Sequence, residues 1–457
     1  MKVIICGAGL VGYSIAKYLI AEENDVTVVD NNPELVSKIN ENLDCRGQIG
    51  HASSPAVLEK AGIEDADMLI ALTREDEVNM LACQVASTLF NVPRTLARVR
   101  EQTYLQTKYS QLFSNEGCPI DVIVSPEKEV AEAIVRRVRA NGAFDVVPFC
   151  DDSIAVIGVL VNKKAKILNL ELDRLIGEYD NTQMNIMGIM RGEKQIIPNA
   201  KTVIEIGDKV YFACAKYMMR PCLDLFGHED EENNRLLFIG AGNVGMYVAS
   251  VFEKEKEYSL RVIEKDKMAA KKMAEKMPST TIINGDALDS NVLEESGIHQ
   301  YDVCISVTND DETNLLTSLL AKNAGVSRVI SLINNNDYGV LTDKLGVDVR
   351  VNPRDITASI ILESIRHGNV KSLYALPENI VEILEIEVSG DATIADKPLK
   401  DIKMPKNVHF GLVKSKDEIY VPYGDAILRE GDRVVLSVET KNTKKITGLF
   451  ASIKEFY

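Results

Sequence analysis

A glycine-rich hexapeptide occurs twice in the chain, and this repeat constrains the fold more than any other feature. The segment Gly7-Ala-Gly-Leu-Val-Gly12 returns as Gly240-Ala-Gly-Asn-Val-Gly245, and the segments that follow stay in step. Thr73–Asn79, for example, matches Thr308–Asn314. Self-similarity over a long period indicates a duplicated structural unit. The sequence therefore predicts two similar halves, joined by the acidic, polar segment 227–234.

Short apolar runs alternate with segments of helical pattern in the first half, and the second half repeats this order. The predicted strands are Lys2–Cys6, Val26–Val29, Arg46–Ile49, Met68–Leu72 and Leu96–Val99. The predicted helices are Leu10–Ile20, Pro33–Asn40, Pro55–Ala61 and Glu75–Phe90. Such alternation is typical of a parallel, doubly wound sheet.

The pattern changes near residue 140 and again near residue 375, where short strands are interrupted by turns at Gly207-Asp208 and Gly431-Asp432. This change predicts a small α+β lobe behind each sheet. The expected fold class is therefore α/β, with two tandem Rossmann-like, doubly wound parallel sheets, each followed by a small α+β lobe. The predicted lobes cover residues 1–140, 141–228, 235–372 and 373–457.

The first glycine motif follows a strand and opens a helix, which is the context of a dinucleotide-binding fingerprint. Gly7 permits the tight turn, Gly9 lets the backbone approach a pyrophosphate, and Gly12 allows close packing of helix on strand. Phosphate would lie at the helix N-terminus. Asp30, after the second strand, is a candidate for binding the ribose hydroxyls. The competing interpretation is a purely structural turn.

The second half repeats these residues as Gly240, Gly242, Gly245 and Glu264. The interpretation as a purely structural turn has more weight here, because a repeated motif can keep its structure after its function is lost. Lys265 follows Glu264, whereas Asn31 follows Asp30, so the two sites could prefer different nucleotides.

Thr73 with Asp76, and Thr308 with Asp311, fit a variant of the helix capping box. Both pairs also follow a strand at the carboxyl edge of the sheet, where ligands of open α/β folds bind. Two interpretations of Thr73 remain open: it caps the helix only, or it caps the helix and also contacts the ligand.

Two further side chains in the first half are candidate ligand contacts. Arg98 could reach a phosphate or a ribose, or be a solvated surface arginine, and its counterpart is Leu332. His51 could lie near an adenine, although a loop histidine without function is the more common case.

Charge and composition limit the partners. The net charge of −16 opposes binding to nucleic acid. No apolar run approaches the roughly 20 residues of a membrane span, and no signal peptide is recognisable, so a cytosolic location is expected. The eight cysteines are scattered singly, which predicts reduced, mostly buried thiols with no metal or redox role.

Two enzyme classes compete with a binding protein. An NAD-dependent dehydrogenase would need a proton-transfer group near the nicotinamide, yet the five histidines form no recognisable catalytic cluster. A flavin-dependent disulfide reductase would need a closely spaced cysteine pair, which the sequence lacks. We therefore expect a nucleotide-binding regulator without catalytic or metal-binding residues.

Two apolar segments of helical spacing follow the last strand of each sheet, at Val130–Val138 and Ile356–Ile365. The simpler interpretation is a helix packed on its own sheet. We expect them instead to pack between halves or subunits, giving a homo-oligomer.

The doubled arrangement of these motifs resembles the family of RCK proteins (regulators of potassium conductance), in particular the tandem regulators of Trk potassium-uptake systems. The resemblance covers essentially the whole chain. It implies binding of NAD or NADH, or of ATP or ADP, and a ring-shaped homo-oligomer, a tetramer, on the inner face of the membrane beneath a potassium-translocating subunit of the Trk system. The implied contacts in the first half are Gly7, Ala8, Gly9, Leu10, Val11, Gly12, Asp30, Thr73, Arg74 and Arg98. Those in the second half are Gly240, Ala241, Gly242, Asn243, Val244, Gly245, Glu264, Thr308 and Asn309.

Overall fold

The structure is a computed structural model of the chain. It describes residues 1–21, 23–101, 103–114, 117–173, 183–192, 194–228, 233–335, 338–365, 369–376, 381–416 and 418–452. These residues form two compact units. The first contains Met1–Glu129 and Pro353–Ile365, and the second contains Val130–Asn352 and Arg366–Tyr457. The four lobe boundaries along the chain remain predictions.

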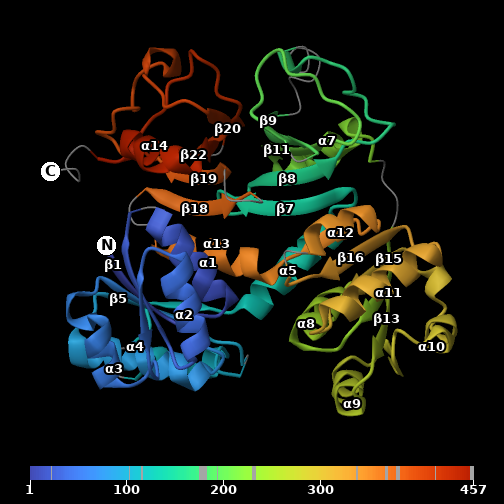
Figure 1. Cartoon of the computed structure of the whole chain (residues 1–457). Helices are drawn as coiled ribbons and strands as arrows, with labels where there is room; N and C mark the ends of the chain where they lie inside the picture. The colour runs from blue at the N-terminus through green and yellow to red at the C-terminus, as the bar shows by residue number, and fades with distance from the viewer. Residues whose placement is uncertain are drawn as a thin grey trace. The chain divides into compact units, whose positions relative to one another are not determined.

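The first unit is built on a parallel sheet with the order β3-β2-β1-β4-β5-β6. Figure 1 labels its strands β1 and β5. Its strands are β1 (Lys2–Cys6), β2 (Asp25–Asp30), β3 (Arg46–Ile49), β4 (Met68–Ala71), β5 (Arg94–Arg98) and β6 (Val122–Val124). Its helices are α1 (Leu10–Ala21), α2 (Pro33–Asn42), α3 (Pro55–Ala61) and α4 (Asp76–Phe90). All predicted strands and helices of this half are confirmed, with ends that shift by one or two residues.

The central strands of this sheet are apolar along their whole length because helices cover both faces. Every residue of β4 is buried, and only the first residue of β1 is exposed. Continuous burial of this kind is characteristic of parallel strands in α/β folds. The strand order reverses between β1 and β4, and ligands of open α/β sheets bind at such a switch point.

The second unit contains the same sheet again, with the order β14-β13-β12-β15-β16-β17. Its strands are β12 (Arg235–Ile239), β13 (Ser259–Glu264), β14 (Thr281–Asn284), β15 (Val303–Ser306), β16 (Arg328–Leu332) and β17 (Val349–Val351). Its helices are α8 (Asn243–Phe252), α9 (Lys267–Lys276), α10 (Ser290–Glu295), α11 (Asp311–Asn323) and α12 (Gly339–Lys344). The predicted repeat of the Rossmann-like sheet is confirmed.

Two helices leave their own halves, α5 (Pro126–Arg139) and α13 (Pro353–Ile365). In the first unit, α13 from the second half packs against α1 and β6 of the first half. In the second unit, the C-terminal part of α5 contacts α8: the Tyr247 hydroxyl donates to Glu132 Oε1 (3.1 Å), and the Arg139 guanidinium lies 5.8 Å from the centre of the Phe252 ring. The expected packing of these helices between halves is confirmed.

The two small lobes belong to the second unit and have the same antiparallel topology. The first contains β7 (Ala143–Phe149), β8 (Ile154–Leu160), β9 (Met184–Arg191), β10 (Lys194–Ile196), β11 (Lys209–Ala215) and α7 (Met219–Leu225). The second contains β18 (Val370–Ala375), β19 (Val381–Glu387), β20 (Val408–Ser415), β21 (Glu418–Tyr420), β22 (Arg433–Glu439) and α14 (Thr443–Phe450).

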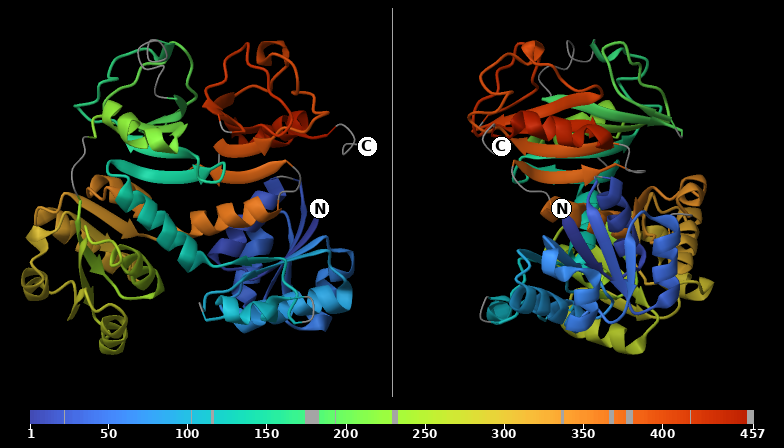
Figure 2. Two further views of the ribbon diagram at one scale, coloured as in Figure 1. Left: turned by 180° about the vertical axis from the view of Figure 1, so that it is seen from behind. Right: turned by 60° about the vertical axis from the view of Figure 1, so that its left-hand side comes forward.

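These lobes share a hydrophobic core at their junction, and the first lobe also closes a separate core of its own. The shared core joins Val156 and Ala213 of the first lobe to Ile383 and Val435 of the second. Figure 2 shows the green and the orange-to-red lobes side by side. Backbone and side chains also bond across the junction: Asn185 Nδ2 donates to the Phe410 carbonyl at 2.7 Å. The lobes therefore act as one packed body.

Among the described residues, no helix is long and apolar enough to span a membrane. All eight cysteines are free, and all except Cys45 are buried. The described part of the chain holds no group of three or more histidine, cysteine, aspartate or glutamate side chains arranged to bind a metal ion.

Candidate functional site

The three glycines of each motif have different steric roles. Gly7 has a φ of +116°, and a Cβ at this position would lie 3.0 Å from the carbonyl group of Leu72. A Cβ on Gly12 would lie 1.9 Å from the carbonyl oxygen of Gly7. The fold itself therefore requires glycine at Gly7 and Gly12, which provide the turn and the close contact between α1 and the loop.

Gly9 differs, because nothing lies within 4 Å of a Cβ built there and its φ lies outside the left-handed region. Gly242 is equally open in the second half, whereas a Cβ on Gly245 would lie 2.2 Å from the Gly240 carbonyl oxygen. The fold does not need glycine at Gly9 or Gly242. A bare backbone at these positions leaves room for a ligand to approach the peptide groups.

The acidic residues after β2 and β13 contact the glycine loops directly. Asp30 Oδ2 accepts a hydrogen bond from the backbone N–H of Ala8 (2.7 Å), and its Oδ1 accepts from that of Asn32 (2.8 Å). Glu264 Oε2 likewise accepts from the backbone N–H of Ala241 at 2.5 Å. A carboxylate oxygen can accept more than one bond, so these groups keep capacity for hydroxyl donors. Both carboxylates lie where the fingerprint predicts a ribose ligand.

The capping boxes predicted after β4 and β15 are wrong. The N-cap of α4 is Glu75, and the Asp76 carboxylate instead accepts from the backbone N–H groups of Arg100 and Glu101 (2.9 and 2.8 Å). In the second half Asp310 is the N-cap of α11, and Asp311 accepts from the backbone N–H of Asn334. These acids hold the loop after the next strand, because the helix begins later than the sequence pattern predicts.

A buried asparagine fixes each threonine of these loops, and sequence reasoning missed it. Thr73 donates from its hydroxyl and from its backbone N–H to Asn79 Oδ1 (2.7 and 2.8 Å). Asn79 Nδ2 donates to the backbone carbonyl of Arg98 at 2.9 Å, which ties the loop to β5. Thr308 and Asn314 repeat these contacts at 2.7 and 2.8 Å. The available signal was the recurrence of an asparagine six residues after each threonine.

Arg98 is a half-buried cation, with 17% of its side chain exposed, and not the solvated surface arginine considered above. Its Nη2 lies 3.8 Å from Glu127 Oε1, while the buried Nε has no hydrogen-bond partner among the described residues. Burial lowers the pKa of its guanidinium, and the charge of Arg100 acts in the same direction. A buried donor without a partner is costly. The counterpart Leu332 is buried and apolar.

The remaining candidates around the loops are exposed or half-buried. Leu10 is 60% exposed, and Arg74, Asn243 and Asn309 are exposed. His51 is exposed, with its Nδ1 2.9 Å from Ser53 Oγ. Val11 and Val244 are half-buried in the first turns of α1 and α8.

Lys265 forms an ion pair in the second half. Its Nζ lies 2.8 Å from Asp286 Oδ2, and this contact raises the pKa of the lysine and lowers that of the aspartate. Its charge is therefore largely compensated before any ligand binds.

Solved structures of RCK domains have a similar arrangement of two parallel sheets, each followed by an antiparallel lobe. The RCK domain of GsuK superposes with a TM-score of 0.62 over 98% of this chain and 94% of that chain, at 17% identity. A GsuK channel structure bound to NAD gives a TM-score of 0.61 over 98% of this chain and 78% of that chain, also at 17% identity. These similarities concern the fold.

The sequence comparisons give the family. The TrkA-N domain model matches residues 3–126 and 236–353, and the TrkA-C domain model matches 383–451. The Trk system potassium uptake protein TrkA of Azorhizobium caulinodans is 39% identical over the full length of both chains. That of Haemophilus influenzae is 35% identical over 98% of both. The chain belongs to the TrkA family.

Proposed function

We propose that the chain is a nucleotide-binding regulatory subunit of a Trk-type potassium-uptake system. The observation that carries the nucleotide part is the steric freedom at Gly9 and Gly242, beside carboxylates that contact the same loops. The relatives that match over their full length are Trk system potassium uptake proteins, and they support the transport part.

The first site would hold NAD or NADH, or an adenine nucleotide such as ATP or ADP. The loop from Gly7 to Val11 would bind the phosphates, Asp30 the ribose hydroxyls, and Arg98 a phosphate or ribose oxygen, with Thr73 and Arg74 at the rim. The NAD bound to the GsuK channel supports this choice of ligand. In the second site Gly240 to Val244, Glu264, Thr308 and Asn309 would take the same roles. With Leu332 in place of the arginine, we expect weaker binding of a phosphate there.

Regulation would require only that the nucleotide bind two conformations of the protein with different affinity. The exchanged helices α5 and α13 support a coupled response, because each packs on the glycine-motif helix of the other half. The conformational change would be transmitted to a membrane subunit that translocates potassium, with this chain on the cytoplasmic side of the membrane. We propose a ring-shaped tetramer, and a monomeric mass by light scattering at micromolar concentration would contradict it.

Calorimetric titration with NADH, NAD, ATP and ADP tests the proposal. Asp30→Ala should weaken binding to the first site about tenfold to a hundredfold, and Glu264→Ala should act on the second site alone. Unchanged affinities in Asp30→Ala would mean that the first loop is only a structural turn. A normal nucleotide response of potassium uptake in cells, despite weakened binding, would separate the site from regulation.

An NAD-dependent oxidoreductase is the alternative function. We propose that the chain turns over no nucleotide, so NADH mixed with the protein and a broad set of carbonyl substrates should keep its absorbance. Sustained, protein-dependent oxidation of NADH would favour the oxidoreductase.

A further inference from the structure

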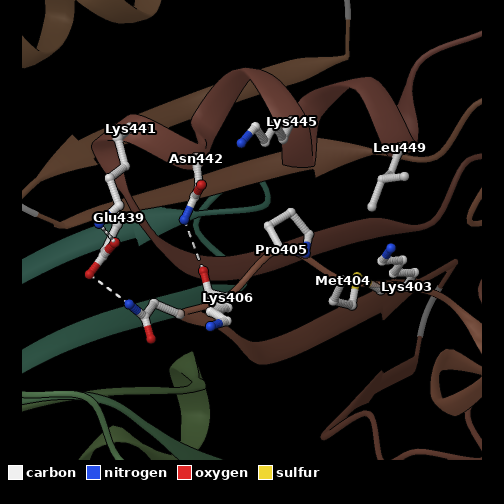
Figure 3. Close-up of a pocket in the computed structure, with 10 residues that line it drawn as sticks. Lys403, Met404, Pro405, Lys406, Glu439, Lys441, Asn442, Lys445 and Leu449 are labelled. Atoms are coloured by element: carbon white, nitrogen blue, oxygen red, sulfur yellow. Dashed lines mark hydrogen bonds and ion pairs between the residues drawn. The ribbon is translucent and has the colours of Figure 1, made fainter.

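A lysine-lined cavity lies in the second small lobe, in a part of the chain without a glycine motif. Its volume is about 480 Å³. One wall is the loop 403–407 before β20, and the other is formed by Glu439 at the end of β22 and by the first two turns of α14 (Figure 3). Cavities of roughly 300–1,000 Å³ are the size that holds small-molecule ligands.

The cavity concentrates positive charge in an acidic protein. Among the described residues, four lysines line it, Lys403, Lys406, Lys441 and Lys445, against the single carboxylate of Glu439. The whole chain carries a net charge of −16. The local excess of cations therefore opposes the general charge of the molecule, and it favours an anion at this place.

The charge of Glu439, the only acidic side chain among the described residues of the lining, is already compensated. Lys441 Nζ lies 2.7 Å from Glu439 Oε2, and Asn407 Nδ2 donates to Glu439 Oε1 at 2.7 Å. The ion pair with Lys441 lowers the pKa of Glu439, whose side chain is 17% exposed. Within the described residues, Lys403, Lys406 and Lys445 form no ion pair. Three uncompensated charges thus face one small volume.

The walls of the cavity are held together by a hydrogen bond that does not involve the lysine ammonium groups. Asn442, which is 8% exposed, donates from Nδ2 to the backbone carbonyl of Lys406 at 3.0 Å. Met404, Pro405 and Leu449 supply an apolar part of the lining. The cavity therefore combines a hydrogen-bonded frame, an apolar surface and cationic side chains.

The first small lobe provides an internal comparison. Its strand β11 ends at Ala215 where β22 ends at Glu439, and each strand leads through a short 3-10 turn into a helix. In this alignment Tyr217 and Pro221 take the places of Lys441 and Lys445. The same strand, turn and helix form without those lysines, so the fold does not require them.

We propose that this cavity binds a small, soluble organic phosphate with at least two negative charges, whose apolar part lies against Leu449 and Pro405. Lys403, Lys406 and Lys445 would contact the phosphate oxygens, and the Glu439–Lys441 pair would fix the rim. This ligand site is separate from the glycine loops, so it does not depend on the proposed nucleotide function.

Calorimetric titration of the full chain with inorganic pyrophosphate tests the proposal. The double variant Lys403→Gln/Lys445→Gln should bind pyrophosphate on the order of tenfold more weakly. The control Lys397→Gln/Lys416→Gln removes the same charge from exposed lysines of this lobe outside the lining, and its affinity should stay within about twofold of the unmodified chain. NADH affinity should be equal in all three proteins, which separates this test from that of the glycine loops.

Three outcomes would overturn the proposal. An equal loss of pyrophosphate affinity in both double variants would show that only the overall charge matters. Unchanged affinity in both variants would show that the cavity does not bind pyrophosphate. Binding to phosphatidylglycerol vesicles that is lost in Lys403→Gln/Lys445→Gln and not displaced by pyrophosphate would make the surface a membrane contact instead. Matching unfolding temperatures of the two variants ensure that a loss of binding is not a loss of folding.

Discussion

Replacing Gly9 by alanine is the sharpest test of whether the first glycine loop binds a ligand. Asp30 is less suitable, because it also holds the loop through the backbone N–H of Ala8, and its removal mixes stability with binding. Gly9 has no such role, since its side of the loop is open for at least 4 Å. A methyl group added at Gly9 would contact no atom of the protein within 4 Å, so it would affect only a bound ligand.

The structure sets opposite expectations for two glycines of one motif. In Gly9→Ala, a small loss at the helix start is offset by lower entropy of the unfolded chain, so the free energy of unfolding should change by no more than about 0.5 kcal/mol. In Gly12→Ala, the new Cβ would lie 1.9 Å from a backbone carbonyl oxygen. That overlap should cost about 3 kcal/mol of stability.

For nucleotide affinity, Gly9→Ala should be costly although it leaves the fold intact. The methyl group would separate the loop N–H groups from a phosphate, and loss of hydrogen bonds to a charged group costs roughly 1.5–3 kcal/mol, about tenfold to a hundredfold in affinity. Urea denaturation gives the stability and calorimetry with NADH gives the affinity. Gly242→Ala is the matched control for the second site. If Gly9→Ala binds every nucleotide as the unmodified chain does, the reasoning from the open position is refuted.

Two further predictions concern buried polar groups. Asn79→Ala removes the acceptor of both Thr73 bonds and a donor to the Arg98 carbonyl, so we expect about 2–3 kcal/mol lower stability in urea denaturation, and a loss below 0.5 kcal/mol would contradict the assigned role. Asp145 accepts from the buried Arg137 and, at 2.5 Å, from the Tyr374 hydroxyl, so Asp145→Asn should leave a buried cation without its partner and cost about 3–5 kcal/mol. An unchanged unfolding temperature in that variant would show that solvent reaches this group.

The sequence predicted the sheets and the glycine loops well because local chemistry determines them. Gly7 and Gly12 are required by backbone geometry within the motif itself. The apolar runs of β1 and β4 are continuous because both faces of a parallel sheet are covered. The glycine motif and the apolar runs depend on residues that are close in the chain. Because the chain is duplicated, each of these signals occurs twice.

The roles of individual polar side chains were harder to predict. Thr73 and Asp76 fit a capping pattern, yet the threonine bonds Asn79 and the aspartate bonds the loop after β5. The sequence placed Arg98 in a strand, but it predicted neither its burial nor its ion pair with Glu127 at the start of α5. The contacts of Asp76 and Arg98 join residues far apart in sequence, and no local pattern reports them, whereas the repeated spacing of Thr73 and Asn79 was a local signal.

The sequence by itself determined that two Rossmann-like halves exist, where each glycine loop lies, and that the segments after each sheet are helical. Only the tertiary structure decided that α13 packs in the first unit and α5 on α8, and that the two small lobes share one core. The physical reason is that the apolar face of a helix requires burial, but it does not determine which other element buries it. In a duplicated chain two similar partners are available, and packing in three dimensions selects between them.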